Sequence, residues 1–346
     1  MLDSVPGNGP DKRKQGIPES ASGAWQINDS TPSVVVVITE LNAARTIKGC
    51  LQRVFTQTYP REKYSVILVD AGSDDGTLEL AKEFGATGLR IVVRRGCSEP
   101  EGQHTGVELT SSDIVLFTNS DIYVPPDWIA KHVEWHRRGY GLVGGGVFWG
   151  GDKYTFAWNT ARGRGPTFEI EEGAGIGFSN CSVVRSLYAS AGGIRDLHSQ
   201  QDIEFAFRVV RSGGRLVLDP AIEVYHNHPQ KSLSFVLRRS FGYAYNHMLV
   251  VKIFYGRLKP AEGMPIRIDL GQQVANILGL RARRVYRERH QAASSWGINI
   301  GFWEFLFIRQ CVRFPAHYLG LVLGYLTPAP NLESVRNLHR LNPAVN

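Results

Sequence analysis

Cysteine is scarce in this chain of 346 residues, and its four cysteines stand far apart. Cys50, Cys97, Cys181 and Cys311 form no Cys-x-x-Cys pair, so the sequence predicts neither a structural zinc site nor a disulfide framework. A reducing, cytoplasmic setting fits this usage best. The first stretch, MLDSVPGNGPDKRKQG, has no apolar segment of the kind found in secretory signals, so we expect no export signal.

Long apolar runs are also missing. The most apolar segment, INIGFWEFLFIRQCVRFPAHYLGLVLGYL, is interrupted by Glu304, Arg309 and Arg313. It therefore falls short of the roughly 18 uninterrupted apolar residues that indicate a membrane-spanning helix. The chain has no internal repeat, and no recognised nucleic-acid motif accompanies its basic residues, so we expect no nucleic-acid partner.

Charge and hydrophobicity are those of a basic globular protein. Hydrophobic residues make up 43% of the chain and charged residues 21%, which allows a sizeable core. The formal net charge is +7 and favours anionic partners. The arginines of RARRVYRERH form either a solvated helix face or a surface for anionic lipid headgroups; they are Arg281, Arg283, Arg284, Arg287 and Arg289.

The first part of the chain alternates buried strands with helices. β-branched and apolar runs predict strands at 33–39, 64–70, 89–94 and 113–118. Apolar periodicity predicts helices at 43–57, 77–85 and 102–109. This alternation indicates right-handed βαβ units and a parallel sheet. Ligands of such sheets bind beyond the carboxyl ends of the strands, which is where Asp70 and Asp121 stand.

The later part of the chain is less regular. PDWIAKHVEWHRRG and QDIEFAFRVVRSGG predict helices, and GLVGGGVFWGG predicts a glycine-rich strand. We expect EEGAGIGFSNCSVVR to be irregular, and RLVLDPAIEVYHNHP to form a strand, a turn and a second strand. The pattern divides the chain into a disordered tail (1–30), an α/β domain (31–230) and a C-terminal helical region (231–346).

Each polar residue near these strand ends has two interpretations. Asp121 either binds a divalent cation or belongs to a turn, and the same choice applies to Asp70 as a nucleotide contact. Asp202 is either a helix-capping or first-turn carboxylate or a general base kept ionised by the helix dipole. His226 and His228 are either ligands of a metal or phosphate or structural side chains.

The order of these segments resembles that of the family 2 glycosyltransferases, which have the GT-A fold. The resemblance lies in VVVVITELNAARTIKGCLQRVFTQTYP and VILVDAGSDDGT, in TNSDIYVPPDWI, and in GFSNCSVVRSLYASAGGIRD and QQDIEFAFRVVRSGGRLVLDPAIEVYH. It covers about residues 31–245. It implies a Rossmann-like, mostly parallel central sheet flanked by helices. The arginines near aromatic residues in the C-terminal part predict a helical extension at the membrane interface.

The chain departs from the family pattern at several positions. Asn119 replaces the first Asp of the family's Asp-x-Asp motif, and Ala71 replaces the second Asp of its nucleotide turn. Gln201 replaces the Glu that precedes the base. Thr39, Glu40 and Ala43 stand where Pro, Thr and Glu are usual.

The resemblance implies an inverting enzyme that moves a sugar from a nucleotide-diphosphate sugar to a hydroxyl of a glycan or lipid-linked glycan. Asp202 would be the general base, and Asp121 and His226 would hold Mg²⁺ or Mn²⁺. Donor contacts would come from Thr39, Glu40, Asn42, Asp70, Gly72, Ser120 and Asp121. On the acceptor side would lie Asn180 and Gln201. The protein would sit peripherally on an anionic membrane surface at the cytoplasmic face.

Two alternatives remain open from the sequence. One is a sugar-phosphate nucleotidyltransferase, although TELNAARTI lacks the Gly-rich, basic signature expected after the first strand. The other is a non-catalytic, membrane-associated binding protein on a decayed transferase scaffold, which Asn119, Ala71 and Gln201 favour.

Overall fold

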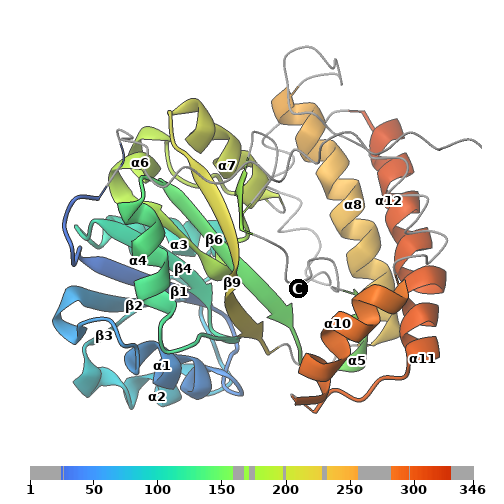
Figure 1. Ribbon diagram of the computed structural model, residues 1–346, viewed down its shortest axis with the longest axis horizontal. Coiled ribbons are helices and arrows are strands. Elements are labelled where there is room, and N and C mark those ends of the chain that lie inside the picture. Colours follow the sequence, from blue (N-terminus) through green and yellow to red (C-terminus); the bar gives the residue numbers. More distant parts are fainter. Residues whose placement is uncertain are drawn as a thin grey trace, which may run out of the picture.

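The computed structural model describes Trp25 and residues 27–158, 167–170, 176–197, 200–227, 232–255, 282–295 and 297–328. Most of the expected N-terminal tail (1–30), together with His228 and Arg281, lies outside these ranges. Figure 1 shows an α/β domain built on one twisted sheet and a group of C-terminal helices beside it.

Four strands form the parallel part of the sheet. Their order is β3-β2-β1-β4, and all three pairings are parallel. Their bounds lie within a residue or so of the predicted ones: β1 (Val34–Glu40), β2 (Tyr64–Asp70), β3 (Leu89–Val93) and β4 (Ile114–Asn119). The connecting helices are α1 (Ile47–Phe55), α2 (Thr77–Lys82) and α3 (Glu99–Glu108). The predicted alternation of strand and helix is therefore confirmed.

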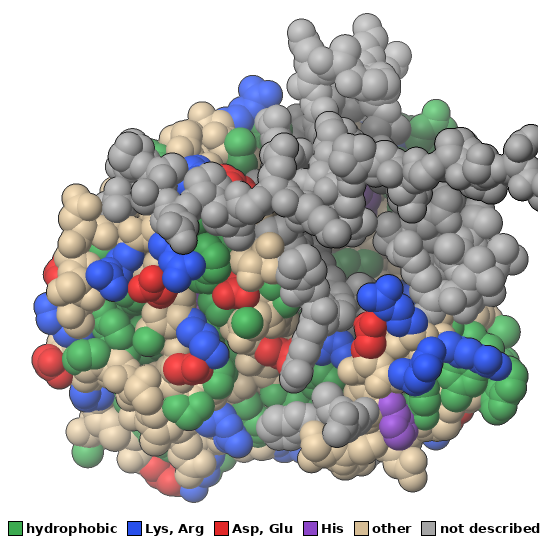
Figure 2. Space-filling model, in the orientation of Figure 1, with side chains coloured by type: hydrophobic (Ala, Val, Ile, Leu, Met, Phe, Trp, Pro, Cys, Tyr) green, Lys and Arg blue, Asp and Glu red, His purple; other side chains and the backbone are tan. Residues whose placement is uncertain are grey.

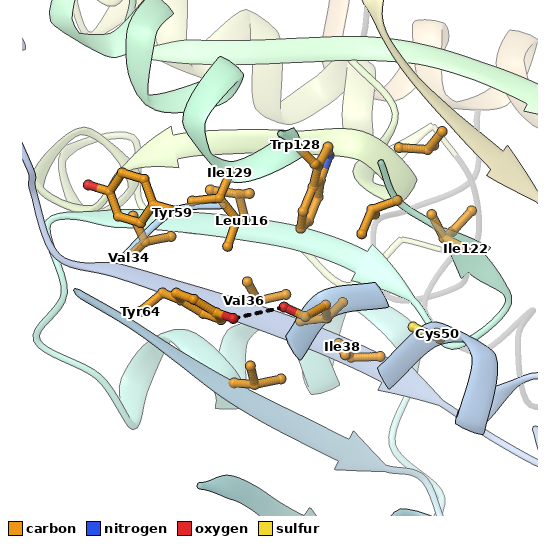
Figure 3. Close-up of a cluster of buried hydrophobic side chains, with 14 of the residues drawn as sticks. Val34, Val36, Ile38, Cys50, Tyr59, Tyr64, Leu116, Ile122, Trp128 and Ile129 are labelled. Carbon is orange, nitrogen blue, oxygen red and sulfur yellow. Dashed lines mark hydrogen bonds between the residues drawn. The ribbon is translucent and has the colours of Figure 1, made fainter. Parts of the chain in front are cut away.

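β1 lies at the centre of two hydrophobic layers, as its unbroken β-branched sequence requires. Val34, Val36 and Ile38 face the side that α1, α2 and α4 cover (Figure 3). Val35 and Val37 face the opposite side, with side chains from α3, α6 and α7. All five are at most 1% exposed, so the strand contributes no side chain to solvent until its polar end.

Beyond β4 the sheet becomes mixed. The order continues β4-β8-β6-β9-β5, and β7 pairs with β9. β8 is antiparallel to both β4 and β6, whereas β6 and β9 are parallel. The strands are β5 (Ile122–Tyr123), β6 (Leu142–Trp149), β7 (Phe168–Ile170), β8 (Cys181–Val184) and β9 (Leu216–His226). The helices of this part are α4 (Trp128–Arg137), α5 (Lys153–Trp158), α6 (Arg185–Ser190) and α7 (Gln201–Arg211).

Two sequence expectations for this part were wrong. Residues 216–226 form the single strand β9 instead of two strands and a turn, because the register against β6 shifts between Gly145 and Gly146 and absorbs Pro220. A Cβ at Gly146 would lie 2.8 Å from the Pro220 carbonyl oxygen, so glycine permits this approach. The segment expected to be irregular contains β8, whose pairing with β4 and β6 is long-range and invisible to local pattern.

The C-terminal lobe is helical where it is described, as predicted. It comprises α8 (Leu233–Tyr255), α10 (Ala282–Ser295), α11 (Phe302–Phe307), the π-helix η5 (Ile308–Arg313) and α12 (Phe314–Leu326). α8 and α12 lie side by side (Figure 1). A Cβ at Gly320 of α12 would lie 2.3 Å from the Phe241 carbonyl oxygen, so glycine allows close helix contact. None of the described helices is long and apolar enough to span a membrane.

The sequence analysis placed all five arginines of RARRVYRERH on a surface, and this was wrong for Arg289 of α10. It is 7% exposed, and its Nη1 lies 2.7 Å from Glu223 Oε1 of β9, so it binds α10 to the sheet. Arg283, Arg284 and Arg287 are exposed, as a surface role requires.

The contact between α3 and β1 can be tested at Gly106. A Cβ there would lie 2.4 Å from Val37 Cγ1, so Gly106→Ala forces the helix off the sheet. Overpacking of this kind costs about 1–3 kcal/mol, and we expect a Tm several degrees lower in thermal unfolding. Gly242→Ala is the matched control, because this α8 glycine has no atom within 4 Å of the added Cβ. It should be neutral or stabilising by up to about 1 kcal/mol. Equal effects of the two changes would contradict the packing described.

Candidate active site

The carboxyl ends of β1, β2 and β4 meet at one edge of the sheet. Glu40 pairs in register with Asp70, and Thr39 pairs with Asn119. The predicted polar residues of three separate segments are therefore neighbours. This is the position at which open α/β sheets bind ligands.

The turn after β2 is organised around Asp70, which is fully buried. Its Oδ1 accepts hydrogen bonds from the backbone N–H groups of Gly72 (2.7 Å) and Ser73 (2.9 Å). Gly72 has φ +108°, a conformation that favours glycine. The loop after β1 is tied to this turn, since Asn42 N donates to Ser73 Oγ (2.8 Å) and Asn42 Oδ1 accepts from Asp74 N (3.0 Å). Three of the predicted donor residues, Asn42, Asp70 and Gly72, thus belong to one hydrogen-bonded unit.

Glu40 and Asp70 form a buried pair of carboxyl groups. Glu40 is 7% exposed, and burial, a hydrogen bond with Asp70 and the Asp70 charge raise its pKa to about 9. Burial alone would raise the pKa of Asp70, but hydrogen bonds from Glu40, Ser73 and Gly72 bring it below its usual range. Asp70 Oδ2 has no other donor in the described part of the chain. Glu40 is therefore neutral at pH 7 and donates its proton to ionised Asp70.

Asp121 and His226 are brought together from residues 105 apart in the sequence. β5 pairs with β9 so that Ile122 lies opposite His226, and His226 Nε2 donates to Asp121 Oδ2 at 2.9 Å. His226 is 5% exposed, and its ring centre lies 4.2 Å from that of Trp149. The strand pairing and the tryptophan hold this histidine in one orientation.

Asn119 and Glu99 extend this group on the other side. Asn119 Nδ2 donates to Glu99 Oε1 at 3.0 Å, while the buried Asn119 Oδ1 has no hydrogen-bond partner among the described residues. Glu99 is the first residue of α3. Part of its side chain is exposed, but the protein around its carboxyl group desolvates it and raises its pKa. The sequence analysis missed Glu99. The local sequence signal here is a capping box, and its residues are the neighbours Ser98 and Glu101.

The residues at this edge fit a divalent cation bound together with a diphosphate. The described part of the chain contains no cluster of three or more His, Cys, Asp or Glu side chains able to hold a metal ion by themselves. Mg²⁺ in phosphate sites typically needs one or two carboxylates plus substrate oxygens. Asp121, with His226 hydrogen-bonded to it, supplies such a carboxylate, and Asn119 Oδ1 is a second oxygen that lacks a partner.

Asp202 lies in the first turn of α7, but it is not the N-cap. That position belongs to Gln200, whose φ is +66° and whose side chain makes no capping bond. Burial, and then the charge of Asp202, raise the pKa of the Cys181 thiol, which places Asp202 near the start of β8. Because β8 runs antiparallel to β4, that start lies beside the carboxyl end of β4.

Glu204 anchors the helix that carries Asp202. Its side chain is 2% exposed, and Arg208 binds it with Nε and Nη2, both at 2.7 Å. Arg195 Nη1 lies 2.8 Å from the same carboxylate. Paired N–H contacts of this kind fix orientation as well as position. The sequence analysis did not identify Glu204, because an amphipathic helix pattern does not show which acid is buried.

Asn180, predicted on the acceptor side, is a core residue in the structure. It is 1% exposed; Oδ1 accepts from Trp128 Nε1 (2.8 Å) and His132 Nε2 (3.1 Å). Its Nδ2 donates to the carbonyl oxygens of Gly146 (2.9 Å) and Ile222 (2.7 Å). With every hydrogen-bonding position in use, Asn180 holds α4, β6 and β9 together. Gln201, the other acceptor-side prediction, is half-buried at the start of α7.

Comparison with known proteins shows which class of protein this fold and site resemble. The model of the family "Glycosyl transferase family 2" matches residues 35–189. Glycosyltransferase AglE of Haloferax volcanii is 29% identical over 62% of this chain and 73% of its own length. Residues 35–189 are therefore similar to family 2 glycosyltransferases, and the chain has a GT-A fold, as the sequence predicted.

One further relative and one solved structure are also similar to this chain. An undecaprenyl-phosphate 4-deoxy-4-formamido-L-arabinose transferase of Aeromonas hydrophila is 32% identical over 34% of this chain, which spans 37% of that enzyme. The mannosyltransferase PcManGT of Pyrobaculum calidifontis, solved with GDP-Man and Mn²⁺, superposes with a TM-score of 0.54. It is 17% identical, and the match covers 94% of this chain and 91% of that one, so it shows the shared fold.

Because Glu40 and Asp70 share one proton, the free energy of unfolding depends on pH, and the sign of this dependence can be predicted. In the unfolded chain Glu40 ionises near pH 4.5, but in the folded protein it does so near pH 9. Its stabilising contribution is complete below pH 4.5 and is lost as the pH rises toward 9. Glu40→Gln keeps a neutral donor to Asp70 at every pH. We expect it to raise the free energy of unfolding by about 1 kcal/mol or more at pH 8, and to have little effect near pH 4.5.

Thermal or urea unfolding across pH 4.5–9 measures this effect. Glu79→Gln is the control, because Glu79 lies on α2 away from the Asp70 hydrogen bonds. A Glu40→Gln effect that does not change with pH would show that Glu40 is ionised in the folded protein.

Proposed function

We propose that the protein is an inverting glycosyltransferase that takes a nucleotide-diphosphate sugar and glycosylates a hydroxyl group of a glycan or lipid-linked glycan. The observation that carries the proposal is the meeting of Asp70, Asp121 and His226 at one edge of the sheet. They come from β2, the β4–β5 turn and β9, so the tertiary fold alone unites them. PcManGT, which has the same fold, was solved with GDP-Man and Mn²⁺, and this supports the donor class and the metal.

The nucleoside would lie against the turns that follow β1 and β2. Asp70 is the ionised member of the carboxyl pair, and Glu40 holds it in place. Thr39, Asn42 and Gly72 belong to the same two strand ends and would complete this contact. The Thr39 hydroxyl is buried and has no hydrogen-bond partner in the described part of the chain, so it is available to a ligand.

The diphosphate would lie next to Asp121, with Ser120 before it and His226 beside it. Asp121 and Asn119 would hold Mg²⁺ or Mn²⁺, with His226 fixing the Asp121 carboxylate or joining it as a ligand. When bound, the cation acts as a Lewis acid that stabilises negative charge on the leaving diphosphate.

Asp202 would accept the proton of the acceptor hydroxyl as that oxygen attacks the anomeric carbon. The N-terminus of α7 favours its ionised form. Attack from the face opposite the leaving group needs one base and no covalent sugar intermediate, which gives inversion. Gln201, the neighbouring side chain, would contact the acceptor.

A peripheral position on an anionic membrane at the cytoplasmic face would suit the C-terminal lobe. Figure 2 shows basic side chains beside hydrophobic ones over α10 and α11. Trp303 is 73% exposed and Leu326 is 68% exposed, which is unusual for such large apolar side chains. Exposed arginines next to apolar side chains fit an interfacial arrangement. The relative from Aeromonas hydrophila is named as acting on undecaprenyl phosphate, which supports a lipid-linked acceptor.

The role of Asp202 is tested by Asp202→Asn, which removes the base and keeps the shape of the side chain. General-base catalysis contributes about 10²–10⁴-fold, so we expect transfer to fall by at least about 100-fold in an assay of nucleotide release with acceptor. Nucleotide affinity should stay unchanged. Asp127→Asn, at the N-cap acid of α4 that pairs with Lys131, is the control and should keep full activity. Loss of nucleotide binding in Asp202→Asn would assign the residue to the donor side instead.

The metal and the donor class are tested by calorimetric titration of UDP, GDP and dTDP with Mn²⁺ or with EDTA. One nucleotide should bind at least about tenfold more tightly with Mn²⁺, since the cation links the diphosphate to Asp121. Asp121→Asn should abolish that difference, and Asp127→Asn should retain it. Equal binding in EDTA would refute the metal site. Absence of binding by all three nucleotides would favour the non-catalytic alternative.

A further inference from the structure

Two arginines of η5 lie inside the C-terminal lobe. Arg309 is 5% exposed and Arg313 is half-buried. The guanidinium carbon of each lies 5.2 Å from the centre of the Phe314 ring, so the two charges share one aromatic neighbour. A π-helical turn such as η5 occurs often at functional sites.

The charge on Arg313 has no carboxylate partner in the described part of the chain, and its N–H groups form no hydrogen bond there. Burial lowers its pKa to about 9, with a further contribution from the charge of Arg309. A guanidinium carries five N–H donors, and a buried charge is costly unless an opposite charge compensates it. Folding alone gives no reason to place it there.

His317 lies next to Arg313, and a second histidine, His247, lies next to His317. His317 follows Arg313 by one helical turn, and burial, Arg313 and His247 together lower its pKa to about 4. Burial also lowers the pKa of His247 on α8. Both rings are therefore neutral at pH 7 and can hydrogen-bond a ligand without adding charge. The close contact of α12 with α8 at Gly320 holds the two helices that carry them together.

This group is connected to the helix of the proposed base. His247 Nδ1 lies 3.1 Å from Gln200 Oε1. Gln200 is the N-cap of α7, and Asp202 stands in the first turn of that helix. A ligand bound by the arginines would therefore lie on the acceptor side of the enzyme.

We propose that Arg309, Arg313 and His317 form a binding site for a phosphate or diphosphate group. Two guanidinium groups match a dianion, and their planar N–H pairs fit phosphate oxygens. The inference rests on the proposed function in assigning the phosphate to a lipid-linked acceptor. α12 continues from this site with exposed apolar side chains that would contact the lipid chain; they are Leu319, Val322, Leu323 and Leu326.

The test uses the full chain in EDTA, so that the proposed metal-dependent donor site does not contribute. Inorganic phosphate and pyrophosphate should raise the Tm of the wild-type protein in a concentration-dependent way. Arg313→Met should lose this rise while unfolding at the same or a higher temperature without ligand, since it removes a half-buried charge that no carboxylate in the described part of the chain compensates. Arg283→Gln, at an exposed arginine of α10, should keep the rise. Arg313→Lys, which keeps the charge but not the paired N–H groups, should give a smaller rise.

An equal rise of Tm in wild type and Arg313→Met, or no rise in either, would overturn the inference. The source of the phosphate is decided by comparing farnesyl phosphate with vesicles containing phosphatidylglycerol. Loss of farnesyl phosphate binding in Arg313→Met, with vesicle binding retained, assigns an acceptor. The reverse result assigns a membrane headgroup and overturns the acceptor role. Nucleotide affinity with Mn²⁺, measured on the same variants, tests the proposed function separately, because Arg313 is not part of the donor site.

Discussion

The register of β1 against its two parallel neighbours determines where the polar groups of the site lie. Because Glu40 is level with Asp70 and Thr39 with Asn119, the three strands expose their polar ends at one place. Shifting β1 by one residue would turn Val35 and Val37 toward the layer that now holds Val34 and Val36, and would move Glu40 away from Asp70. The two buried layers on β1 therefore fix the site as firmly as the hydrogen bonds do.

The position of Glu40 beside Asp70 has an electrostatic consequence. Two carboxyl groups buried at adjacent strand ends cannot both ionise cheaply, so one proton is retained between Glu40 and Asp70. The turn N–H groups of Gly72 and Ser73 decide which group is ionised, because both point at Asp70. Glu40, which departs from the usual family residue, thus becomes a neutral hydrogen-bond donor and keeps the charge on the residue that would face the nucleoside.

Local sequence pattern predicted the four parallel strands nearly to the residue, because strands such as β2 are continuous apolar runs bounded by polar turns. It also predicted that Asp70 and Asp121 stand at strand ends. It failed where long-range contact decides the outcome. The pairing of β8 with β4, the burial of Asn180 and the ion pair of Arg289 with Glu223 each depend on a segment distant in sequence. The protonation of Glu40 depends on the same kind of contact.

The cost of buried charge differs between the two halves of the molecule, and the difference is informative. Glu204 is buried, but Arg208 and Arg195 both bind its carboxylate, so its negative charge is compensated and α7 is anchored. Arg313 is half-buried, yet its charged neighbour is Arg309, and the adjacent His317 is neutral. Aromatic contact with Phe314 offsets part of this cost, since cation–π attraction is worth about 0.5–2 kcal/mol. The remainder must come from packing elsewhere, such as the glycine contact of α12 with α8. A positive charge held at such a cost, next to the helix of the proposed base, is best explained by an anion that binds there.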